Sequence, residues 1–558
     1  MPGLRDRKTP GVYVTEIPAF PPSAVGVETA IPAFVGYTER AEVAGRPAFN
    51  TPIPINSIDE YHTFFGGPPK PTFRFDDGSE LDFDVRFPDI DVAGEAKNET
   101  PTKYRKLTPT GQVGLLYRSL SLFYVNGGGR CYVVSVGTYG AEVDSKKLKE
   151  GVDALQDQAG PTMLLVPDLS LLAAPSSLPA VDGFKDVAVA MLDQCQKKQD
   201  RVALLDVVHA LGISHTSTSQ ALEQAIEQFR ADVDHEFRNY GIAYFPHLNT
   251  SLVRANDLDY TWFEPAGLQD FVLNEALKLF PNPQDDAVKS AVLAVKKDFA
   301  ENNAEGSKTV DTALQDVKKT NEPAAQKLGF LYHSFYQPVE VKTRDQNLTN
   351  AFPALRQLYG SAAQKLNRLP ASAAIAGVMT FTDSARGVWN APANMALVSV
   401  DAPSLTISDD VLGDLNKPLD GKAINVIREF IGRGPVVWGA RTLDGNSNDY
   451  RYVQVRRTLI YIEQSVKAAM NPFVFAPNDG KTWVTVTSMI SNFLQDLWAK
   501  GGLMGATANE AYSVDCGLGT TMSAHDVLEG YMVVRVLVQL IRPAEFIELT
   551  FKQKMENA

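Results

Sequence analysis

The sequence predicts a large protein of mixed α/β and α+β class, whose mixed-sheet body carries extended β-strand arms at both chain ends and a β-rich insertion. Three observations support this fold class. The chain has 558 residues, enough for roughly three or four compact units. Residues 111–245 alternate helical patterns with nearly continuous apolar strands, as in an open sheet covered on both faces. Each chain end holds a short alternating segment that proline separates from the body.

The first residues predict a free strand arm. Residues 11–17 (GVYVTEI) read as a short strand that Pro18 ends, and Pro21 and Pro22 separate it from the next apolar run. Because so short a strand cannot bury itself, we expect it to pair with a distant partner. No apolar run suits a signal peptide or a membrane span, so we expect synthesis in the bacterial cytoplasm without a signal peptide and no direct membrane insertion.

Residues 30–36 (AIPAFVG) begin the first folded unit, and an insertion follows at residues 66–110. Within it, residues 73–75 and 81–87 alternate apolar and charged side chains, and residues 76–79 (DDGS) have turn chemistry. This pattern predicts a surface β-hairpin.

The α/β pattern then repeats along the chain. The first expected helix ends near residue 124, and three more span residues 141–158, 181–198 and 218–237. The expected strands are 130–136, 163–166, 201–207 and 241–245. Residues 284–325 are rich in lysine and acidic residues, which predicts exposed helices in a polar insertion.

A second mixed α/β unit is expected from about residue 370, with an apolar stretch at 435–438. Tyr452, Val455, Leu459, Ile462 and Val466 recur at steps of three and four, so they share one face of a helix. A second helix is predicted over residues 482–498, ending at Gly501, although its opening residues 484–487 (VTVT) could equally begin a strand.

The last segment predicts two strands. Residues 531–538 (YMVVRVLV) are apolar enough for a central strand, and Pro543 then interrupts the chain. Beyond it Ile547, Leu549 and Phe551 fall on one side of a second terminal arm.

Composition excludes several classes of function. The chain has 53 basic and 66 acidic residues, a formal net charge of −13, so nucleic acid is not expected as a partner. The three cysteines, Cys131, Cys195 and Cys516, are too few and too widely spaced for a disulfide framework or a Cys-x-x-Cys metal site. We therefore expect no cofactor and no metal.

Motifs for catalysis are also missing from the sequence. Residues 480–482 (GKT) resemble the end of a phosphate loop, but Phe475 stands where that motif needs glycine. Residues 126–129 and 432–434 are glycine-rich and precede strands, so they predict turns. Arg456 and Arg457 lie four residues from Tyr452 and Tyr461, which predicts a structural helix with a charged outer side. We expect no catalytic residues.

The two arms are the most informative feature. Exposed strand edges pair readily with another chain, and a heterologous contact that repeats without closing produces a helical filament. We therefore hypothesise an intersubunit sheet formed by these arm residues: Val12, Tyr13, Val14, Ile17, Phe546, Ile547, Leu549 and Phe551.

Several motifs together resemble contractile tail sheath proteins. At the N-terminus they are residues 9–17 (TPGVYVTEI) and 29–38 (TAIPAFVGYT). In the last third they are residues 383–394 (DSARGVWNAPAN), 432–443 (GRGPVVWGARTL), 452–457 (YVQVRR), 475–479 (FAPND) and 543–546 (PAEF). Residues 126–133 (NGGGRCYV) add to the resemblance, which fades over 66–110 and 250–345. The insertion at 66–110 most resembles sheaths of extracellular contractile injection systems.

The resemblance implies a structural subunit, not an enzyme, that polymerises helically in six-fold rings around an inner tube. It implies contraction that drives the tube through a target envelope, with neighbours linked by exchanged terminal strands. The implied partners are further copies of this chain, the inner tube protein, baseplate and terminal cap proteins, and paralogous sheath subunits. The implied place is a phage tail or a released tail-like particle.

Tube contact is expected from the polar face of the second C-terminal helix, which carries Ser488, Asn492, Gln495 and Lys500. Core packing is the competing interpretation of this helix. Two other functions stay open at this point: a non-contractile filament or shell scaffold, and an α/β enzyme.

The predicted organisation follows from these patterns. It consists of an N-terminal strand arm (1–20), an α/β middle domain (21–65 and 111–369, with the helical insertion at 284–325), an outer β-hairpin insertion (66–110), a C-terminal α/β tube-facing domain (370–542) and a C-terminal strand arm (543–558).

Overall fold

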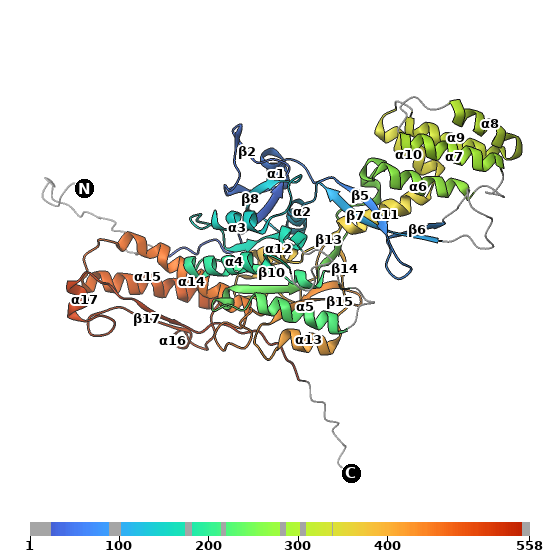
Figure 1. Cartoon of the computed structure of the whole chain (residues 1–558). Helices are drawn as coiled ribbons and strands as arrows, with labels where there is room; N and C mark the ends of the chain where they lie inside the picture. The colour runs from blue at the N-terminus through green and yellow to red at the C-terminus, as the bar shows by residue number, and fades with distance from the viewer. Residues whose placement is uncertain are drawn as a thin grey trace, which may run out of the picture. The chain divides into compact units, whose positions relative to one another are not determined.

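The computed structural model of the chain divides into two compact units, which are described separately (Figure 1). The large unit comprises Ala30–Ser384 and Pro392–Val453, and the small unit comprises Met1–Thr29, Ala385–Ala391 and Gln454–Ala558. The structure describes residues 24–88, 102–172, 181–211, 213, 219–278, 286–301, 308–336 and 339–548. The predicted strand over residues 11–17 lies outside these described residues.

An eight-stranded sheet forms the centre of the large unit. Its order is β16 (Gly434–Trp438), β15 (Ile424–Phe430), β11 (Gly241–Phe245), β10 (Val202–Asp206), β9 (Met163–Leu165), β1 (Pro32–Thr38), β8 (Cys131–Thr138) and β4 (Ile53–Ile55). The six inner strands are parallel, and β4 and β16 are antiparallel edges. Every residue of β10 and β11 is buried, as expected for parallel strands with both faces covered.

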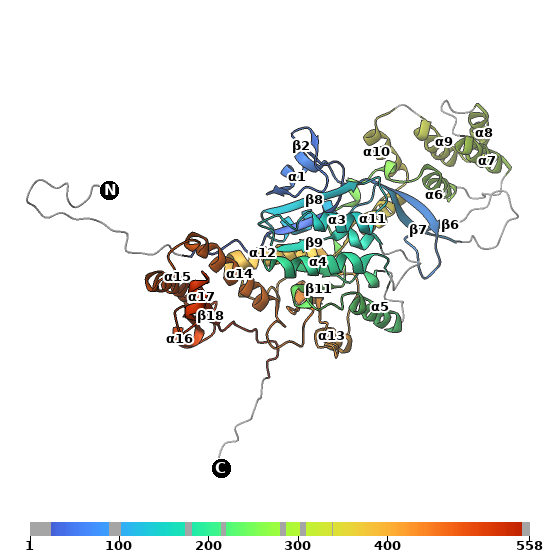
Figure 2. The same cartoon turned by 60° about the vertical axis from the view of Figure 1, so that its left-hand side comes forward.

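Helices cover this sheet in the order that the sequence predicts. α2 (Leu116–Val125) contacts β1, α3 (Ser145–Asp153) contacts β1 and β8, and α4 (Phe184–Lys198) contacts β10. Figure 2 shows α3 and α4 beside the strands β8 and β9 of this sheet. The unit also contains α1 (Ile58–Phe65), α5 (Ser219–Asp232), α12 (Ser372–Arg386), α13 (Asp409–Asn416) and the small strands β2 (Glu42–Val43), β3 (Arg46–Pro47), β12 (Leu248–Thr250), β13 (Arg368–Leu369) and β14 (Val400–Pro403).

The hairpin of β15 and β16 extends the central sheet. The apolar stretch at 435–438 was expected in a second α/β unit, but it forms β16, which pairs with β15, and β15 pairs in parallel with β11. The turn that joins them contains Gly432 and Gly434 at φ values of 77° and 69°, which confirms the predicted tight turn. An apolar strand pattern shows that a strand is buried, but it carries no information about which sheet buries it.

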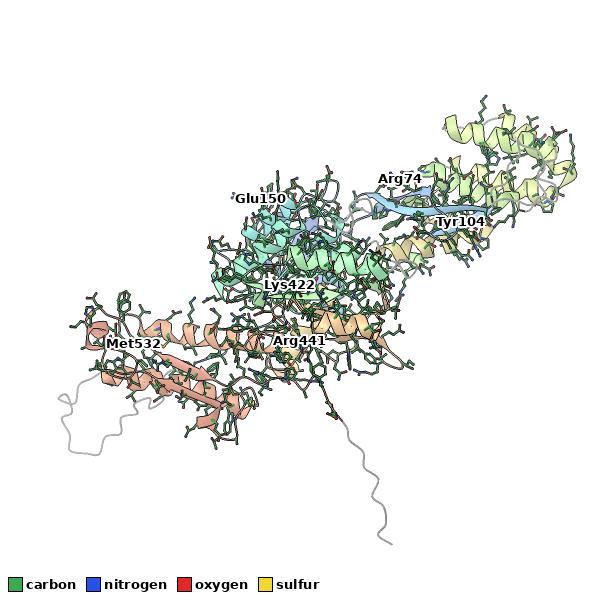
Figure 3. The ribbon with its side chains drawn as sticks, turned by 60° about the horizontal axis from the view of Figure 1, so that its bottom comes forward. Arg74, Tyr104, Glu150, Lys422, Arg441 and Met532 are labelled. Atoms are coloured by element: carbon green, nitrogen blue, oxygen red, sulfur yellow. The ribbon has the colours of Figure 1, made fainter. Side chains whose placement is uncertain are left out.

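The insertion near residue 66 is a three-stranded sheet rather than a hairpin. β7 (Thr102–Gly111) lies between β5 (Pro71–Asp77) and β6 (Val85–Pro88) and pairs antiparallel with both. Figure 3 labels Arg74 on β5 and Tyr104 on β7. The two segments predicted to pair with each other therefore share a third strand, because alternation identifies a strand face but not its neighbour.

Six helices share one hydrophobic core with this small sheet, and we call the sheet and the helices together the inserted module. They are α6 (Pro265–Leu277), α7 (Asp286–Glu301), α8 (Lys308–Thr320), α9 (Glu322–Tyr336), α10 (Val341–Ala351) and α11 (Ala354–Leu366). Phe73 and Phe87 from the sheet belong to the same buried cluster as Val292 of α7 and Val317 of α8. The helices at 284–325 thus bury an apolar face in this core, although Leu293 of α7 is 47% exposed.

The small unit is built on two long helices and a two-stranded ribbon. α14 (Val453–Met470), α15 (Gly480–Ala499), α16 (Ala508–Ala511), β17 (Tyr512–Asp515), α17 (Ala524–Leu528) and β18 (Arg535–Val538) follow in order. The core of this unit includes Ile462 of α14 and Ile490 and Leu494 of α15. The helical interpretation of residues 484–487 is confirmed, and α15 ends before Gly501 at φ 77°.

Two predictions for this region were wrong. β18 is one strand of a ribbon with β17 and not a central strand. Arg456 and Arg457 are 4% and 5% exposed, so the arginines near the start of α14 do not form a charged outer side. Spacing of four residues puts side chains on one helix face, but it does not determine whether that face meets solvent. No helix in the described ranges is long and apolar enough to cross a membrane.

Candidate intersubunit interface

The carboxyl ends of the parallel strands are the place where an α/β enzyme would hold its catalytic groups. Asp168, which follows β9, is fully buried there. Its Oδ2 accepts the backbone N–H of Tyr37 and its Oδ1 that of Leu115, both at 2.6 Å. Leu115 has no side-chain cap of its own, so this carboxylate holds the start of α2. Burial raises the pKa of Asp168 to about 6.

Two further polar contacts at this edge also stabilise the fold. Asp206, the last residue of β10, accepts the backbone N–H of Ser372 at 3.0 Å, and burial raises its pKa to about 6. Ser170 Oγ lies 3.0 Å from His247 Nε2, and both residues are buried. Burial lowers the pKa of His247 to about 3, so the ring is neutral. These groups brace the fold, and their arrangement does not favour the enzyme alternative.

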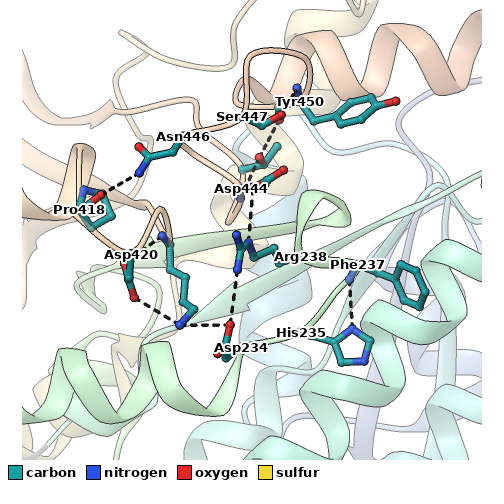
Figure 4. Close-up of polar contacts among 12 residues, drawn as sticks. Asp234, His235, Phe237, Arg238, Pro418, Asp420, Asp444, Asn446, Ser447 and Tyr450 are labelled. Carbon is teal, nitrogen blue, oxygen red and sulfur yellow. Dashed lines mark hydrogen bonds and ion pairs between the residues drawn. The ribbon is translucent and has the colours of Figure 1, made fainter.

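A charged network on the large unit is structural as well (Figure 4). Lys422 Nζ lies 3.2 Å from a carboxylate oxygen of Asp234 and 3.3 Å from one of Asp420. Arg238 Nε lies 3.4 Å from Asp444 Oδ1. The network ties the chain that follows α5 to two loops near the β15–β16 hairpin. Because Lys422 is buried and satisfied by two carboxylates, it offers little to a ligand.

The ribbon of β17 and β18 is the strongest candidate for contact with another chain. Tyr512 pairs with Val538 and Asp515 with Arg535 in an antiparallel register. No third strand pairs with this ribbon within the described ranges. A two-stranded ribbon is marginal by itself and leaves backbone N–H and C=O groups along its outer edges ready for a further strand.

The two faces of the ribbon differ. Along β18 and its approach, one set of alternate side chains packs on the core of the small unit, namely Met532, Val534, Val536, Val538 and Leu540. The opposite set includes Leu537, which is 58% exposed, with Tyr531 and Val533 also exposed. Large apolar side chains on an outer face beside open edges indicate a surface that another chain covers.

The predicted arm residues are only partly described. Val12, Tyr13, Val14, Ile17, Leu549 and Phe551 lie outside the described residues. Phe546 and Ile547 are 67% and 77% exposed, and residues 541–548 form no strand within the described protomer. Their role in an intersubunit sheet therefore stays a prediction.

The predicted polar face lies along α15, but its four residues differ in exposure. Ser488, Asn492 and Lys500 are exposed. Gln495 is partly buried, and its Oε1 accepts the Tyr512 hydroxyl at 3.0 Å, which ties α15 to β17. Val484 and Asp496 are exposed on the same helix and were not predicted. Helical spacing alone could have found Val484, which lies four residues before Ser488.

Phe475, in the loop before α15, is a further surface feature that sequence reasoning missed. Its side chain is fully exposed, and its backbone has a φ of 68°, which is unusual for a residue other than glycine. Its neighbour Val474 is also exposed. An exposed aromatic side chain on a strained backbone indicates a contact surface.

The phosphate-loop-like residues 480–482 form the first turn of α15. The side chain of Asp479 accepts the backbone N–H of Thr482 at 2.9 Å. This hydrogen bond lowers the pKa of the Asp479 carboxyl. Since a carboxylate already occupies the helix N-terminus, a bound phosphate there is disfavoured.

Comparison with known proteins shows which proteins this chain is similar to. Residues 446–554 match the phage tail sheath C-terminal domain. A tail sheath protein of Burkholderia phage BcepMu is 26% identical over 175 residues, which is 30% of this chain and 36% of that relative. The match therefore spans little more than a third of the relative's length.

Two solved structures share the fold over nearly the whole chain. The contracted sheath complex of the extracellular contractile injection system PVC is 22% identical, with a TM-score of 0.55 and 99% coverage of both chains. A chain of the six-fold symmetrised baseplate of the anti-feeding prophage (AFP) is 23% identical, with a TM-score of 0.54, and the match covers 98% of this chain and 100% of that one. These comparisons confirm the resemblance to tail sheath proteins and the mixed α/β fold of a sheath protomer.

Proposed function

We propose that this chain, whose residues 446–554 match the phage tail sheath C-terminal domain, is the structural subunit of a contractile sheath. In this proposal it polymerises helically around an inner tube and contracts to drive the tube through a target envelope. The observation that carries the proposal is the ribbon of β17 and β18, which combines open strand edges with an exposed apolar face in the matched region.

The ribbon would accept strands from neighbouring copies. An added strand satisfies backbone groups along a ribbon edge, and each such hydrogen bond is worth about 0.5–1.5 kcal/mol net. Arms of a few residues would thus link subunits firmly while adding little to the fold of the protomer. The exposed Phe546 and Ile547 support the C-terminal segment as one donor.

Such a linkage suits a polymer that changes shape. Strands held by main-chain hydrogen bonds would stay paired while the rigid α/β bodies rotate and slide. The free energy for contraction would come from extra buried surface, at about 25 cal/mol per Å² of apolar area. Small gains per subunit are sufficient because they add up over the whole sheath.

The exposed face of α15 is the proposed contact with the inner tube. Ser488, Asn492 and Lys500 present hydroxyl, amide and ammonium groups to solvent. The other proposed partners are baseplate and terminal cap proteins and paralogous sheath subunits. A baseplate partner is supported by the likeness to a chain of the AFP baseplate, and a six-fold arrangement by the symmetry of that assembly.

The test is removal of the N-terminal arm. Deleting residues 1–18 should leave a folded, soluble protomer and abolish sheaths in electron micrographs of the chain expressed with its tube and baseplate proteins. Long, ordered sheaths from the deletion would contradict the arm assignment. Filaments of the full chain that keep one length under conditions that trigger contraction would instead support a non-contractile scaffold.

A further inference from the structure

The six residues 24–29 lie against α14 in the small unit and follow the N-terminal arm in the sequence. The backbone N–H of Val27 donates to Ser465 Oγ at 3.1 Å. The carbonyl oxygen of Thr29 accepts from Arg457 Nη2 at 3.4 Å. Ala24 packs against the core of the same unit. The segment therefore has a defined path although it belongs to no helix or strand.

Three side chains of α14 make up the contact surface. Arg457, Tyr461 and Ser465 are spaced four residues apart, so they follow one another along one helix face. Val27 contacts Ser465 and Thr29 contacts Arg457, so the segment runs antiparallel to the helix. These contacts therefore fix both the position and the direction of residues 24–29 on α14.

Gly26 makes this close approach possible. A Cβ at this position would overlap the Tyr461 hydroxyl and would lie 2.8 Å from Cζ of its ring. The ring also packs against Phe493 of the core, with centroids 5.9 Å apart, which limits how far it can yield. Any larger side chain at position 26 would push the segment away from α14.

We propose that residues 24–29 and the α14 row of Arg457, Tyr461 and Ser465 form a clamp that fixes where the N-terminal arm leaves its protomer. This rests on the proposed function, in which the arm pairs with a second copy of the chain. Residues 1–23 can span at most about 76–83 Å. Opening the clamp would lengthen the free arm by roughly 20 Å, at about 3.3–3.6 Å per residue. The clamp thus sets the spacing at which arm-linked neighbours are held.

The clamp can be tested in the full chain before assembly. Gly26→Ala should displace the segment, and Ser465→Ala should remove the acceptor of the Val27 N–H. In hydrogen–deuterium exchange followed by mass spectrometry, the Val27 amide should exchange about tenfold faster in both variants than in the unaltered chain. Gly140→Ala is the matched control, since Gly140 has open space around its Cα. Rapid exchange of the Val27 amide in the unaltered chain would overturn the clamp.

Assembly provides the second readout. Sheaths of Gly26→Ala should lose a uniform helical rise in electron micrographs, while those of Gly140→Ala should keep it. Gly26→Ala sheaths with the helical order of the control would overturn the clamp and leave the sheath proposal intact. Failure of the unaltered chain to form any sheath with its tube and baseplate proteins would contradict the proposed function, and the clamp's role with it.

Discussion

The Asp206 carboxylate accepts a hydrogen bond from the backbone N–H of Ser372 at 3.0 Å, although 166 residues separate the two in sequence. The contact joins the end of β10 to the first residue of α12. Asp168 does the same for the start of α2. In this protein, buried carboxylates at the carboxyl ends of two strand regions hold helix N-termini in place.

The first prediction concerns the stability of this joint. Asp206→Ala leaves the buried Ser372 N–H without its acceptor and should lower the free energy of unfolding by about 1–3 kcal/mol. Asp206→Asn keeps an oxygen at the same place and should cost less. Denaturant unfolding of the two variants measures the difference. Equal stability of Asp206→Ala and the unaltered chain would show that this hydrogen bond contributes nothing.

The second prediction is the pH dependence of the same group. Burial raises the pKa of Asp206 from 3.8 to about 6, so the folded state binds this proton more tightly than the unfolded state. The resulting contribution to stability is fully present below about pH 4 and is lost as the pH rises through 6. Lowering the pH from 7 to 5 should therefore stabilise the unaltered chain relative to Asp206→Asn by about 1 kcal/mol. Parallel unfolding curves of both proteins over this pH range are the measurement, and an opposite trend would contradict the assignment.

The third prediction tests the outer face of the ribbon. Leu537→Glu puts a charge on this face, which the proposed neighbouring chain would cover, and should prevent long sheaths. The substitution is at an exposed position, so the free energy of unfolding should change by no more than about 0.5 kcal/mol. Leu419→Glu, at a fully exposed leucine of the large unit, is the control. Normal sheath length from Leu537→Glu in electron micrographs would argue against the ribbon as the acceptor.

The fourth prediction separates tube binding from sheath formation. Asn492→Glu adds a charge to the exposed face of α15 and should reduce co-sedimentation of the inner tube with the sheath, while sheaths still form. Asn347→Glu makes the same change at an exposed position of α10, in the inserted module, and should leave tube binding unchanged. A tube that binds Asn492→Glu and Asn347→Glu sheaths equally well would remove α15 from the interface.

The central fold could be predicted from the sequence because its signals are local. The buried strands Val202–Asp206 and Gly241–Phe245 are nearly continuous apolar runs, and α15 combines the Asp479 cap with a Gly501 stop. Such patterns are determined by a few neighbouring residues. The predicted elements between residues 111 and 245 therefore agree with the structure.

The parts that differ depend on contacts distant in sequence. Nothing near Pro435 indicates that β16 extends the sheet begun by β1, and nothing near Arg456 shows that its face is covered. The surface candidates were found only in part, since spacing identified Ser488 and Asn492 but could not reveal that Gln495 bonds Tyr512. The exposure and the positive φ of Phe475 could not be predicted from its sequence neighbours, because both depend on the three-dimensional fold.

The inserted module also constrains how such proteins can be altered. Phe73 of β5 and Val292 of α7 lie in one core, although they come from segments far apart in the chain. Removing either segment alone would uncover the apolar side of the other and invite aggregation. An engineer who wants to replace the inserted module with a foreign cargo must therefore exchange both segments together.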